Sequence, residues 1–260
     1  MENHWKKIKI LLSRSFWFRS FYFLFIWIIK YPSFIRDIIK IKKLSKDPRF
    51  PIRFKDIFPC LFDNVKKTNF DPHYIYHPAW AARIISTKIK PKKHTDISSI
   101  LHFSTLVSAF VPVEFYDYRP AEIKLDNLEC KRADLTKLPF DSNSIESISC
   151  MHTVEHVGLG RYGDSIDPEG DIKAINELIR VIKPGGSLLF VVPVGRSRIE
   201  FNAHRIYSYR QVSDMFKNMT LKEFSLIPDN FKDVGMIVDA SEDEVDKQEW
   251  GCGCFWFIKK

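Results

Sequence analysis

Residues 144–194 read SIESISCMHTVEHVGLGRYGDSIDPEGDIKAINELIRVIKPGGSLLFVVPV. The beginning of this stretch, SIESISCM, alternates apolar and polar side chains, which is typical of a strand. Apolar residues then recur at helical spacing over residues 170–182, and the turn at 183–186 separates this helix from the apolar run 187–194. A strand, a helix and a second buried strand form a βαβ unit, and such units predict a mostly parallel sheet.

The same alternation of strands and helices extends outward on both sides of this unit. We predict further strands over 94–98, 113–118, 129–132, 221–227 and 252–258, and further helices over 79–90, 101–110 and 208–218. Because strand–helix–strand crossovers are right-handed, this order predicts an α/β fold whose doubly wound, mostly parallel sheet lies in a three-layer sandwich. We expect this domain to span residues 93–260 and to follow a proline-rich connector over residues 46–92.

Positive charge is concentrated at the N-terminal end of the chain. The net charge is +8, and residues 1–56 hold 14 Lys and Arg against 4 Asp and Glu, whereas the rest of the chain holds 26 against 28. A nearly neutral body argues against a globular nucleic-acid binder with a basic face, so no nucleic-acid partner is expected. The five cysteines form no C-x-x-C pair and no secretory leader is apparent, which favours the reducing cytoplasm.

The basic N-terminal region also holds the most apolar stretch of the chain. Residues 16–29 read FWFRSFYFLFIWII, in which 12 of 14 residues are apolar, and the Trp and Tyr residues in and around it suit a membrane–water interface. We expect residues 1–45 to form an amphipathic or hydrophobic helical extension that contacts an anionic membrane surface through residues 5–44. A helix packed on the body is the alternative, and a short membrane span, which Arg19 disfavours, is a lesser one. No apolar run reaches the ~18 residues of a membrane-spanning helix, so we expect peripheral membrane association.

Three further features, in this order and spacing, resemble the class I S-adenosylmethionine-dependent methyltransferases over about residues 94–194. Asp117 ends the second predicted strand, where a carboxylate can accept both hydroxyls of a ribose. Asp134 precedes the Leu-Pro-Phe run at 138–140, and the fourth predicted strand leads into HTVEH at 152–156. The resemblance implies S-adenosylmethionine as the cofactor. It implies cofactor contacts from Asp96, Ser98, Asp117, Asp134 and Leu135.

A narrower resemblance covers about residues 70–258. The run at 152–171, the Asp-Ile-Ser-Ser loop at 96–99, the segment 202–208 and the late Trp-Gly-Cys-Gly at 250–253 resemble the domain-of-unknown-function family 268. Bacterial members of that family are often associated with surface-polysaccharide gene sets. The resemblance therefore implies a glycan or a lipid-linked sugar as the acceptor. Arg205, after the fifth predicted strand, would suit an anionic acceptor such as a sugar phosphate.

His152, Glu155 and His156 follow the fourth predicted strand, where methyltransferases often place acceptor-binding or base residues. A histidine can accept the proton of a sugar hydroxyl as the oxygen attacks the sulfonium methyl group. We therefore predict His152 or His156 as the base of an O-methyl transfer, with Glu155 orienting it. Packing of His156 beneath the following loop is the alternative.

The glycine-rich run that follows, and a loop after the fifth strand, carry candidate acceptor contacts. These are Arg161, Tyr162, Asp164, His204 and Arg205. The HTVEH run also reads H-x-x-E-H, the inverted zinc-hydrolase motif, but the glycines after it disfavour the helix that such a site needs. Cys252 and Cys254 share one face of a strand and favour core positions. No metal ligand is predicted.

The first loop departs from the methyltransferase pattern. It reads Asp-Ile-Ser-Ser-Ile at 96–100, and Ser98 stands where a glycine is expected. The Cβ of a serine can crowd a ligand or exclude a positive φ. A second hypothesis follows: a catalytically inactive protein of methyltransferase fold that serves as a binding or scaffold module at the membrane.

Overall fold

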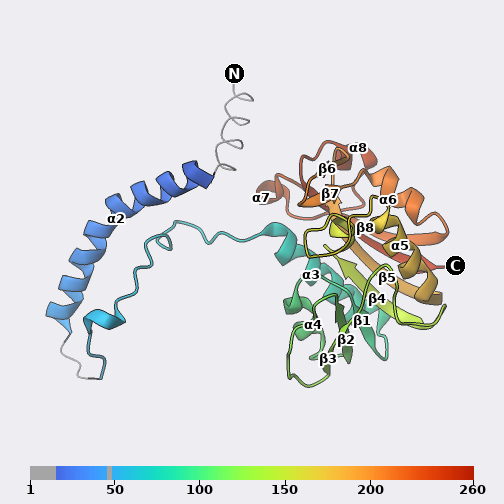
Figure 1. Ribbon diagram of the computed structural model, residues 1–260, viewed down its shortest axis with the longest axis horizontal. Helices are drawn as coiled ribbons and strands as arrows, with labels where there is room; N and C mark the ends of the chain where they lie inside the picture. Colours follow the sequence, from blue (N-terminus) through green and yellow to red (C-terminus); the bar gives the residue numbers. More distant parts are fainter. Residues whose placement is uncertain (1–15, 46–48) are drawn as a thin grey trace. The chain divides into compact units, whose positions relative to one another are not determined.

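The computed structural model describes residues 16–45 and 49–260, and the chain divides into two compact units, Met1–Asn69 and Phe70–Lys260. In the first unit, α2 (Phe16–Leu44) is a helix of 29 residues, and the short 3-10 helix η1 spans Phe54–Asp56 (Figure 1). This confirms the predicted helix over its described part, and residues 1–15 lie outside that part. No helix in residues 16–45 or 49–260 is long and apolar enough to cross a membrane.

The second unit is built on an eight-stranded sheet with the order β3-β2-β1-β4-β5-β10-β8-β9. The first five strands in that order pair in parallel, whereas β10 pairs antiparallel with both β5 and β8. This mostly parallel sheet confirms the predicted α/β fold. The strands are β1 (His94–Asp96), β2 (Val113–Asp117), β3 (Leu128–Arg132), β4 (Ile145–Met151), β5 (Ile182–Val194), β8 (Met219–Ile227), β9 (Ile237–Val238) and β10 (Gly251–Lys259).

Helices pack on both faces of this sheet, which gives the three predicted layers (Figure 1). Neighbouring residues of β5 point to opposite faces: Phe190 lies in one hydrophobic cluster and Leu189 in the other. The first cluster includes residues of α5 (Gly170–Val181) and α6 (Tyr209–Met215), and the second includes residues of α3 (Pro72–Ile84) and α4 (Leu101–Val107). The remaining elements are η2 (Ile85–Ile89), η3 (Val154–His156), β6 (Arg198–Glu200), β7 (His204–Ile206), α7 (Phe231–Val234) and α8 (Glu242–Asp246).

Helix α3 begins at Pro72, well before the start at residue 79 that the apolar spacing predicted. Asp71 caps the helix, because its side chain accepts a hydrogen bond from the backbone N–H of His73 at 3.0 Å. Pro72 occupies the first turn, where a missing N–H is tolerated, and Pro78 lies inside the helix, where it removes one backbone donor. As a consequence, His73 and His77 stand one helical turn apart on the same face.

Candidate functional site

A cavity of about 360 Å³ lies at the carboxyl ends of β1, β2 and β4 and beside the loop after β3. Parallel strands end at one edge of the sheet, so their following loops converge there. The volume falls in the range of ~300–1,000 Å³ that is usual for small-molecule sites. Of the residues predicted to bind or react, the following line this cavity: Asp117, Asp134, Leu135, His152, His156, Tyr162 and Asp164.

Asp117 and Asp134 each use one carboxylate oxygen to stabilise their own turn. Oδ1 of Asp117 accepts a hydrogen bond from the backbone N–H of Arg119 at 2.6 Å. Oδ1 of Asp134 accepts from the backbone N–H and the hydroxyl of Thr136, at 2.8 and 2.7 Å. Within residues 16–45 and 49–260, neither Oδ2 has a hydrogen-bond partner. Both carboxylates are therefore held in place at the cavity, and each has one oxygen that can accept a hydrogen bond from a ligand.

Asp96 and Ser98, which were predicted to contact the cofactor, do not line the cavity. Asp96 is fully buried and accepts hydrogen bonds from the hydroxyls of Ser98, Ser104 and Ser149, the last at 2.5 Å. Burial raises the pKa of Asp96 to about 6, although the three serine hydrogen bonds act in the opposite direction. The structure therefore places this carboxylate beneath the first loop, where it ties the loop to β4 and α4.

The glycine-free first loop has ordinary backbone geometry. None of the described residues 97–100 has a positive φ, so a serine is tolerated where a glycine was expected. The hydroxyl of Ser98 donates a hydrogen bond to Asp96. The two chain neighbours of Ser98, Ile97 and Ser99, line the cavity. The backbone N–H groups of Ile97 and Ser99 donate to carbonyls of β4, at 2.8 and 3.1 Å. The loop thus closes onto the sheet.

His152 has both ring nitrogens occupied by protein groups. Its Nδ1 lies 2.8 Å from Oε1 of Glu155, and its Nε2 lies 3.5 Å from Sγ of Cys252. Glu155 is buried and does not line the cavity. Burial acts to raise the pKa of Glu155, but the hydrogen bond from His152 together with the charges of His152 and His156 outweighs it, and the pKa is lowered. His152 is therefore held by its neighbours and is not free to take a proton from a ligand.

His156 keeps one ring nitrogen available. Its Nδ1 lies 2.7 Å from the carbonyl oxygen of Ala203. A carbonyl only accepts, so Nδ1 carries the proton and Nε2 presents a lone pair. Nε2 lies 4.0 Å from Oε1 of Glu155, and the ring makes an edge contact with Tyr162 at a centroid distance of 5.5 Å. Of the three predicted catalytic residues, His156 alone combines a place in the cavity lining with a free nitrogen in the described structure.

Asp164 folds the glycine-rich loop at the edge of the cavity. Its carboxylate accepts hydrogen bonds from the backbone N–H groups of Gly158, Gly160 and Tyr162, at 2.8, 3.3 and 3.2 Å. Burial acts to raise the pKa of Asp164, but these donors outweigh it and the pKa is lowered. Gly158 has a φ of +79°, and a Cβ there would lie 2.0 Å from the carbonyl oxygen of Asp167, so the position requires glycine. Asp164 and the glycines thereby hold Tyr162 against the cavity.

Arg161, His204 and Arg205, predicted as acceptor contacts, do not line the cavity. Arg205 is buried and donates a hydrogen bond to the carbonyl of Val157 at 2.7 Å. The ring of His204 stacks on Trp250 at a centroid distance of 5.7 Å, and Arg161 donates to a backbone carbonyl at 3.1 Å. In this structure the three side chains support the loops around the cavity.

Arg119 is a cavity residue that the sequence patterns did not single out. It is exposed, lines the cavity, and its guanidinium lies 5.0 Å from the ring centroid of Tyr162. The available signal was its position directly after the predicted strand that Asp117 ends, because residues at that edge face the ligand. A positive charge therefore stands beside the aromatic ring at the cavity.

Comparison with protein families and solved structures relates this geometry to known proteins. Residues 133–236 match the family described as "Caenorhabditis protein of unknown function, DUF268". The search of curated proteins found no match. The 1,6-didemethyltoxoflavin-N1-methyltransferase of Burkholderia thailandensis, solved with 1,6-didemethyltoxoflavin and S-adenosylhomocysteine, is similar with a TM-score of 0.52 and 10% identity, over 71% of this chain and 79% of its own.

Two further solved structures are similar at comparable levels. A candidate sarcosine dimethylglycine methyltransferase from Galdieria sulphuraria has a TM-score of 0.50 and 14% identity, over 70% of this chain and 85% of its own. The N-methyltransferase NodS of Bradyrhizobium japonicum, solved with S-adenosylhomocysteine, has a TM-score of 0.48 and 14% identity, with the same coverage of each chain, 70% and 85%. The predicted resemblance to family 268 is confirmed by the match over residues 133–236, and the predicted fold by the structures from Burkholderia thailandensis and Galdieria sulphuraria.

Proposed function

We propose that this chain, which has the fold of the class I S-adenosylmethionine-dependent methyltransferases, binds S-adenosylmethionine and transfers its methyl group. One observation carries the proposal: Asp117 and Asp134 line a single cavity, each with a carboxylate oxygen left over after its own turn is stabilised. Asp117 would accept the ribose hydroxyls and Asp134 the amino group of adenine, with Leu135 against the base. The Burkholderia thailandensis enzyme of the same fold contains S-adenosylhomocysteine.

The same cavity supports a mechanism for O-methyl transfer. The acceptor oxygen would form a bond to the methyl carbon as the bond from that carbon to sulfur breaks. The electron pair of the broken carbon–sulfur bond would stay on the sulfur of S-adenosylhomocysteine. The acceptor proton would pass to Nε2 of His156, whose tautomer is set by the carbonyl of Ala203. Glu155, with Oε1 at 4.0 Å from Nε2, would stabilise the imidazolium that results.

Polar and aromatic groups beside His156 favour a glycan or sugar phosphate as the acceptor. Tyr162 offers a flat apolar surface of the kind on which a sugar ring packs, and Arg119 lies against the same ring. A guanidinium binds a phosphate through paired hydrogen bonds, so this pair suits an acceptor that is both cyclic and anionic.

Release of S-adenosylhomocysteine from S-adenosylmethionine tests this function. The full-length protein is incubated with a panel of sugar phosphates and aryl glycosides, and we expect at least one acceptor to raise the release rate above the rate without acceptor. If S-adenosylhomocysteine binds but no acceptor in the panel raises the rate, methyl transfer to this acceptor class is contradicted.

The occupied first loop favours a second candidate, a catalytically inactive scaffold of the same fold. The backbone N–H groups of Ile97 and Ser99 donate to carbonyls of β4 and are not offered to a ligand. Such a protein would bind a glycan or a partner without transferring a methyl group. The release assay separates the two candidates, because the scaffold predicts no acceptor-dependent rate.

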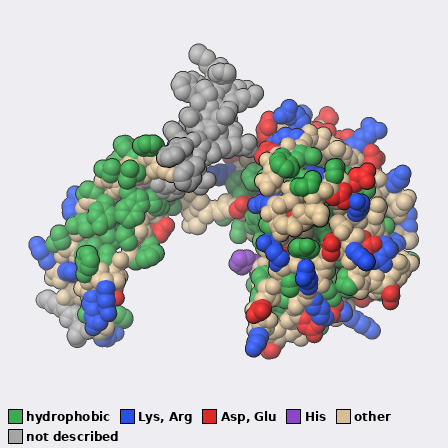
Figure 2. Space-filling view, in the orientation of Figure 1, with side chains coloured by type: hydrophobic (Ala, Val, Ile, Leu, Met, Phe, Trp, Pro, Cys, Tyr) green, Lys and Arg blue, Asp and Glu red, His purple; other side chains and the backbone are tan. Residues whose placement is uncertain are grey.

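We further propose that residues 5–44 attach the protein to the cytoplasmic face of an anionic membrane. In the described part of this segment, Leu24, Ile28, Ile35 and Ile39 are exposed, and their spacing aligns them along one face of α2. Figure 2 shows hydrophobic side chains over much of the helix surface. Basic residues at the end of α2 would each contribute about 1 kcal/mol near an anionic leaflet.

We expect a triple variant, Leu24→Ser, Ile28→Ser and Ile35→Ser, to bind phosphatidylserine vesicles at least about tenfold more weakly than the wild type, because three apolar side chains no longer enter the interface. Flotation of full-length protein with vesicles measures this. Val238→Ser, which removes an exposed apolar side chain from the second unit, should float like the wild type. Equal flotation of the triple variant and the wild type would exclude membrane attachment through this face.

A further inference from the structure

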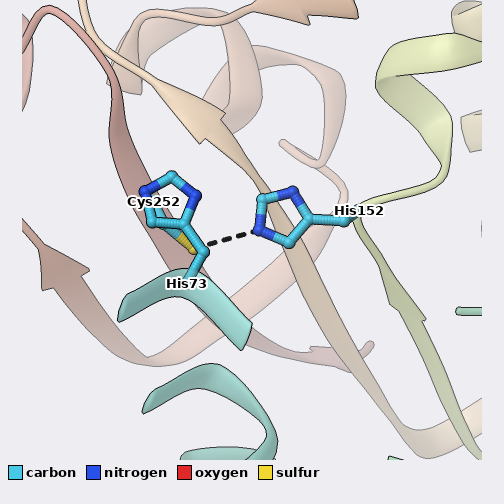
Figure 3. A group of neighbouring side chains, drawn as sticks. All are labelled: His73, His152 and Cys252. Atoms are coloured by element: carbon cyan, nitrogen blue, oxygen red, sulfur yellow. Dashed lines mark hydrogen bonds between the residues drawn. The ribbon is translucent and has the colours of Figure 1, made fainter. Parts of the chain in front are cut away.

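Three potential metal ligands from distant parts of the sequence meet inside the second unit. One donor atom from each of His73, His152 and Cys252 lies within 4.8 Å of the others, and all three residues are buried. Figure 3 shows the side chains converging from α3, from the end of β4 and from β10. A thiolate combined with imidazoles is a ligand set that suits zinc.

The separation of two of these atoms fits a tetrahedral site. Nε2 of His152 and Sγ of Cys252 lie 3.5 Å apart. Two ligands at the usual zinc–nitrogen and zinc–sulfur distances of about 2.0 and 2.3 Å stand about 3.5 Å apart across a tetrahedral angle. The pair is therefore already at the distance that one shared ion requires.

We propose that His73, His152 and Cys252 bind one Zn²⁺ ion, which ties helix α3 to the sheet beside the cavity. All three residues are buried, which favours a structural role for the ion over a catalytic one. Sequence analysis predicted a core position for Cys252 and no metal ligand, because spacing along the chain does not connect residue 73 with residue 252. The proposal does not depend on cofactor binding or methyl transfer.

Glu155 provides the outer partner that zinc-bound histidines usually have. Oε1 of Glu155 accepts a hydrogen bond from the protonated Nδ1 of His152 at 2.8 Å, which leaves the lone pair of Nε2 directed at Cys252. The Glu155 side chain is 1% exposed, and its Oε2 has no hydrogen-bond partner in the described structure. A Zn²⁺ ion, the Cys252 thiolate and the Glu155 carboxylate together carry no net charge, which offsets the burial of that carboxylate.

His77 lies outside this group of three ligands but beside it, and would supply the fourth ligand. It lies on the same face of α3 as His73, and its ring centroid is 5.1 Å from that of His152. It is fully buried, and neither of its ring nitrogens has a hydrogen-bond partner among residues 16–45 and 49–260. Buried polar groups in folded proteins nearly always have a partner, and a metal ion would supply one after a rotation of this side chain.

The competing interpretation is a hydrogen bond from the Cys252 thiol to Nε2 of His152, which the same 3.5 Å separation permits. The two interpretations differ in the protonation of the sulfur. A metal ion requires the thiolate, whereas a hydrogen bond requires the thiol. A probe that reports sulfur–metal bonding therefore separates them.

Titration of the full-length, metal-stripped protein with Co²⁺ is such a probe, because its thiolate charge-transfer band and tetrahedral visible bands report the ligands directly. We expect saturation at one equivalent and displacement by Zn²⁺. Cys252→Ser should remove the charge-transfer band and weaken binding by more than about 100-fold, and His77→Gln should weaken binding about tenfold or more with the band retained. Cys150→Ser is the matched control, because Cys150 is equally buried but lies in the opposite hydrophobic cluster.

A second measurement, the thermal midpoint of the wild type, tests the proposal even if a variant does not fold. Zn²⁺ should raise the thermal midpoint of the wild type relative to chelator, since an ion that binds only the folded state stabilises it. The proposal is overturned if the folded wild type shows no charge-transfer band with Co²⁺, or if Zn²⁺ leaves the midpoint unchanged. Equal titrations of Cys252→Ser and the wild type would also overturn it.

Discussion

Replacing His156 by alanine is expected to lower the rate of methyl transfer by about 10²–10⁴-fold, which is the usual contribution of a positioned general base. The reason is local. Nε2 of His156 is the available imidazole nitrogen of the predicted catalytic set in the described structure, because Nδ1 donates to Ala203 and both nitrogens of His152 are occupied. Acceptor-dependent release of S-adenosylhomocysteine measures the rate.

The affinity of His156→Ala for S-adenosylhomocysteine shows whether the variant has lost only the general base or whether its cavity is also damaged. His156→Ala should bind S-adenosylhomocysteine as the wild type does, because the proposed adenosyl contacts come from other residues. His102→Ala, which removes an exposed histidine from α4, should change neither quantity. A wild-type rate for His156→Ala, with folding intact, would remove this residue from the mechanism.

Replacing Asp117 by alanine is expected to weaken S-adenosylhomocysteine binding by about 100-fold. Hydrogen bonds to a charged group contribute about 1.5–3 kcal/mol each, and a ribose offers two hydroxyl donors to this carboxylate. The substitution also removes the partner of the Arg119 backbone N–H, so the turn that positions the cavity edge loses a 2.6 Å hydrogen bond. Isothermal titration calorimetry measures the dissociation constant.

Two variants control this measurement. Asp117→Asn keeps an oxygen that can accept from Arg119, so it should preserve the turn and still lose most of the affinity. Asp126→Ala removes an exposed carboxylate from the loop between β2 and β3 and should bind normally. Equal affinities for Asp117→Ala and the wild type would show that the adenosyl group is bound elsewhere.

The strands and helices of the second unit are largely predictable from sequence, because their signals are local. Apolar and polar side chains alternate along β4, and α5 has apolar residues at helical spacing, as the sequence indicated. Helix α6 begins where a helix was predicted, and Ser208 caps it with a complete capping box. The start of α3 was predicted too late, because apolar spacing does not reach Asp71 and Pro72, which cap and open this helix. The antiparallel pairing of β10 with β5 depends on contacts between distant residues, which no local pattern encodes.

Some residues of the candidate site are also predictable from sequence, and others are not. Asp117 and Asp134 are brought to the cavity because carboxyl ends of parallel strands converge, which chain order alone implies. Asp96 also ends a strand, but three serine hydroxyls bind it inside the fold, and two of these serines come from α4 and β4. The sequence alone does not distinguish a carboxylate that is hydrogen-bonded inside the fold from one that faces a ligand.

Arg205 and Arg119 show that the arginine beside the cavity could not be identified from sequence. An arginine after the fifth strand suits an anionic acceptor on sequence grounds, but the side chain of Arg205 is buried against Val157 and Asp171, where it joins the loop after η3 to the start of α5. The exposed Arg119, at the end of the strand that carries Asp117, takes the place beside Tyr162 instead. Both outcomes depend on side-chain packing in three dimensions, which spacing along the chain does not determine.

A crystal structure of the full-length protein with S-adenosylhomocysteine tests the central claim most directly, through the distances from the ligand to the Asp117 and Asp134 carboxylates. We predict ribose hydroxyls at about 2.7 Å from Asp117 and the adenine amino group at about 2.9 Å from Asp134, which are ordinary hydrogen-bond lengths. An adenosyl group bound outside this cavity, or no ligand at millimolar concentration, would contradict the account.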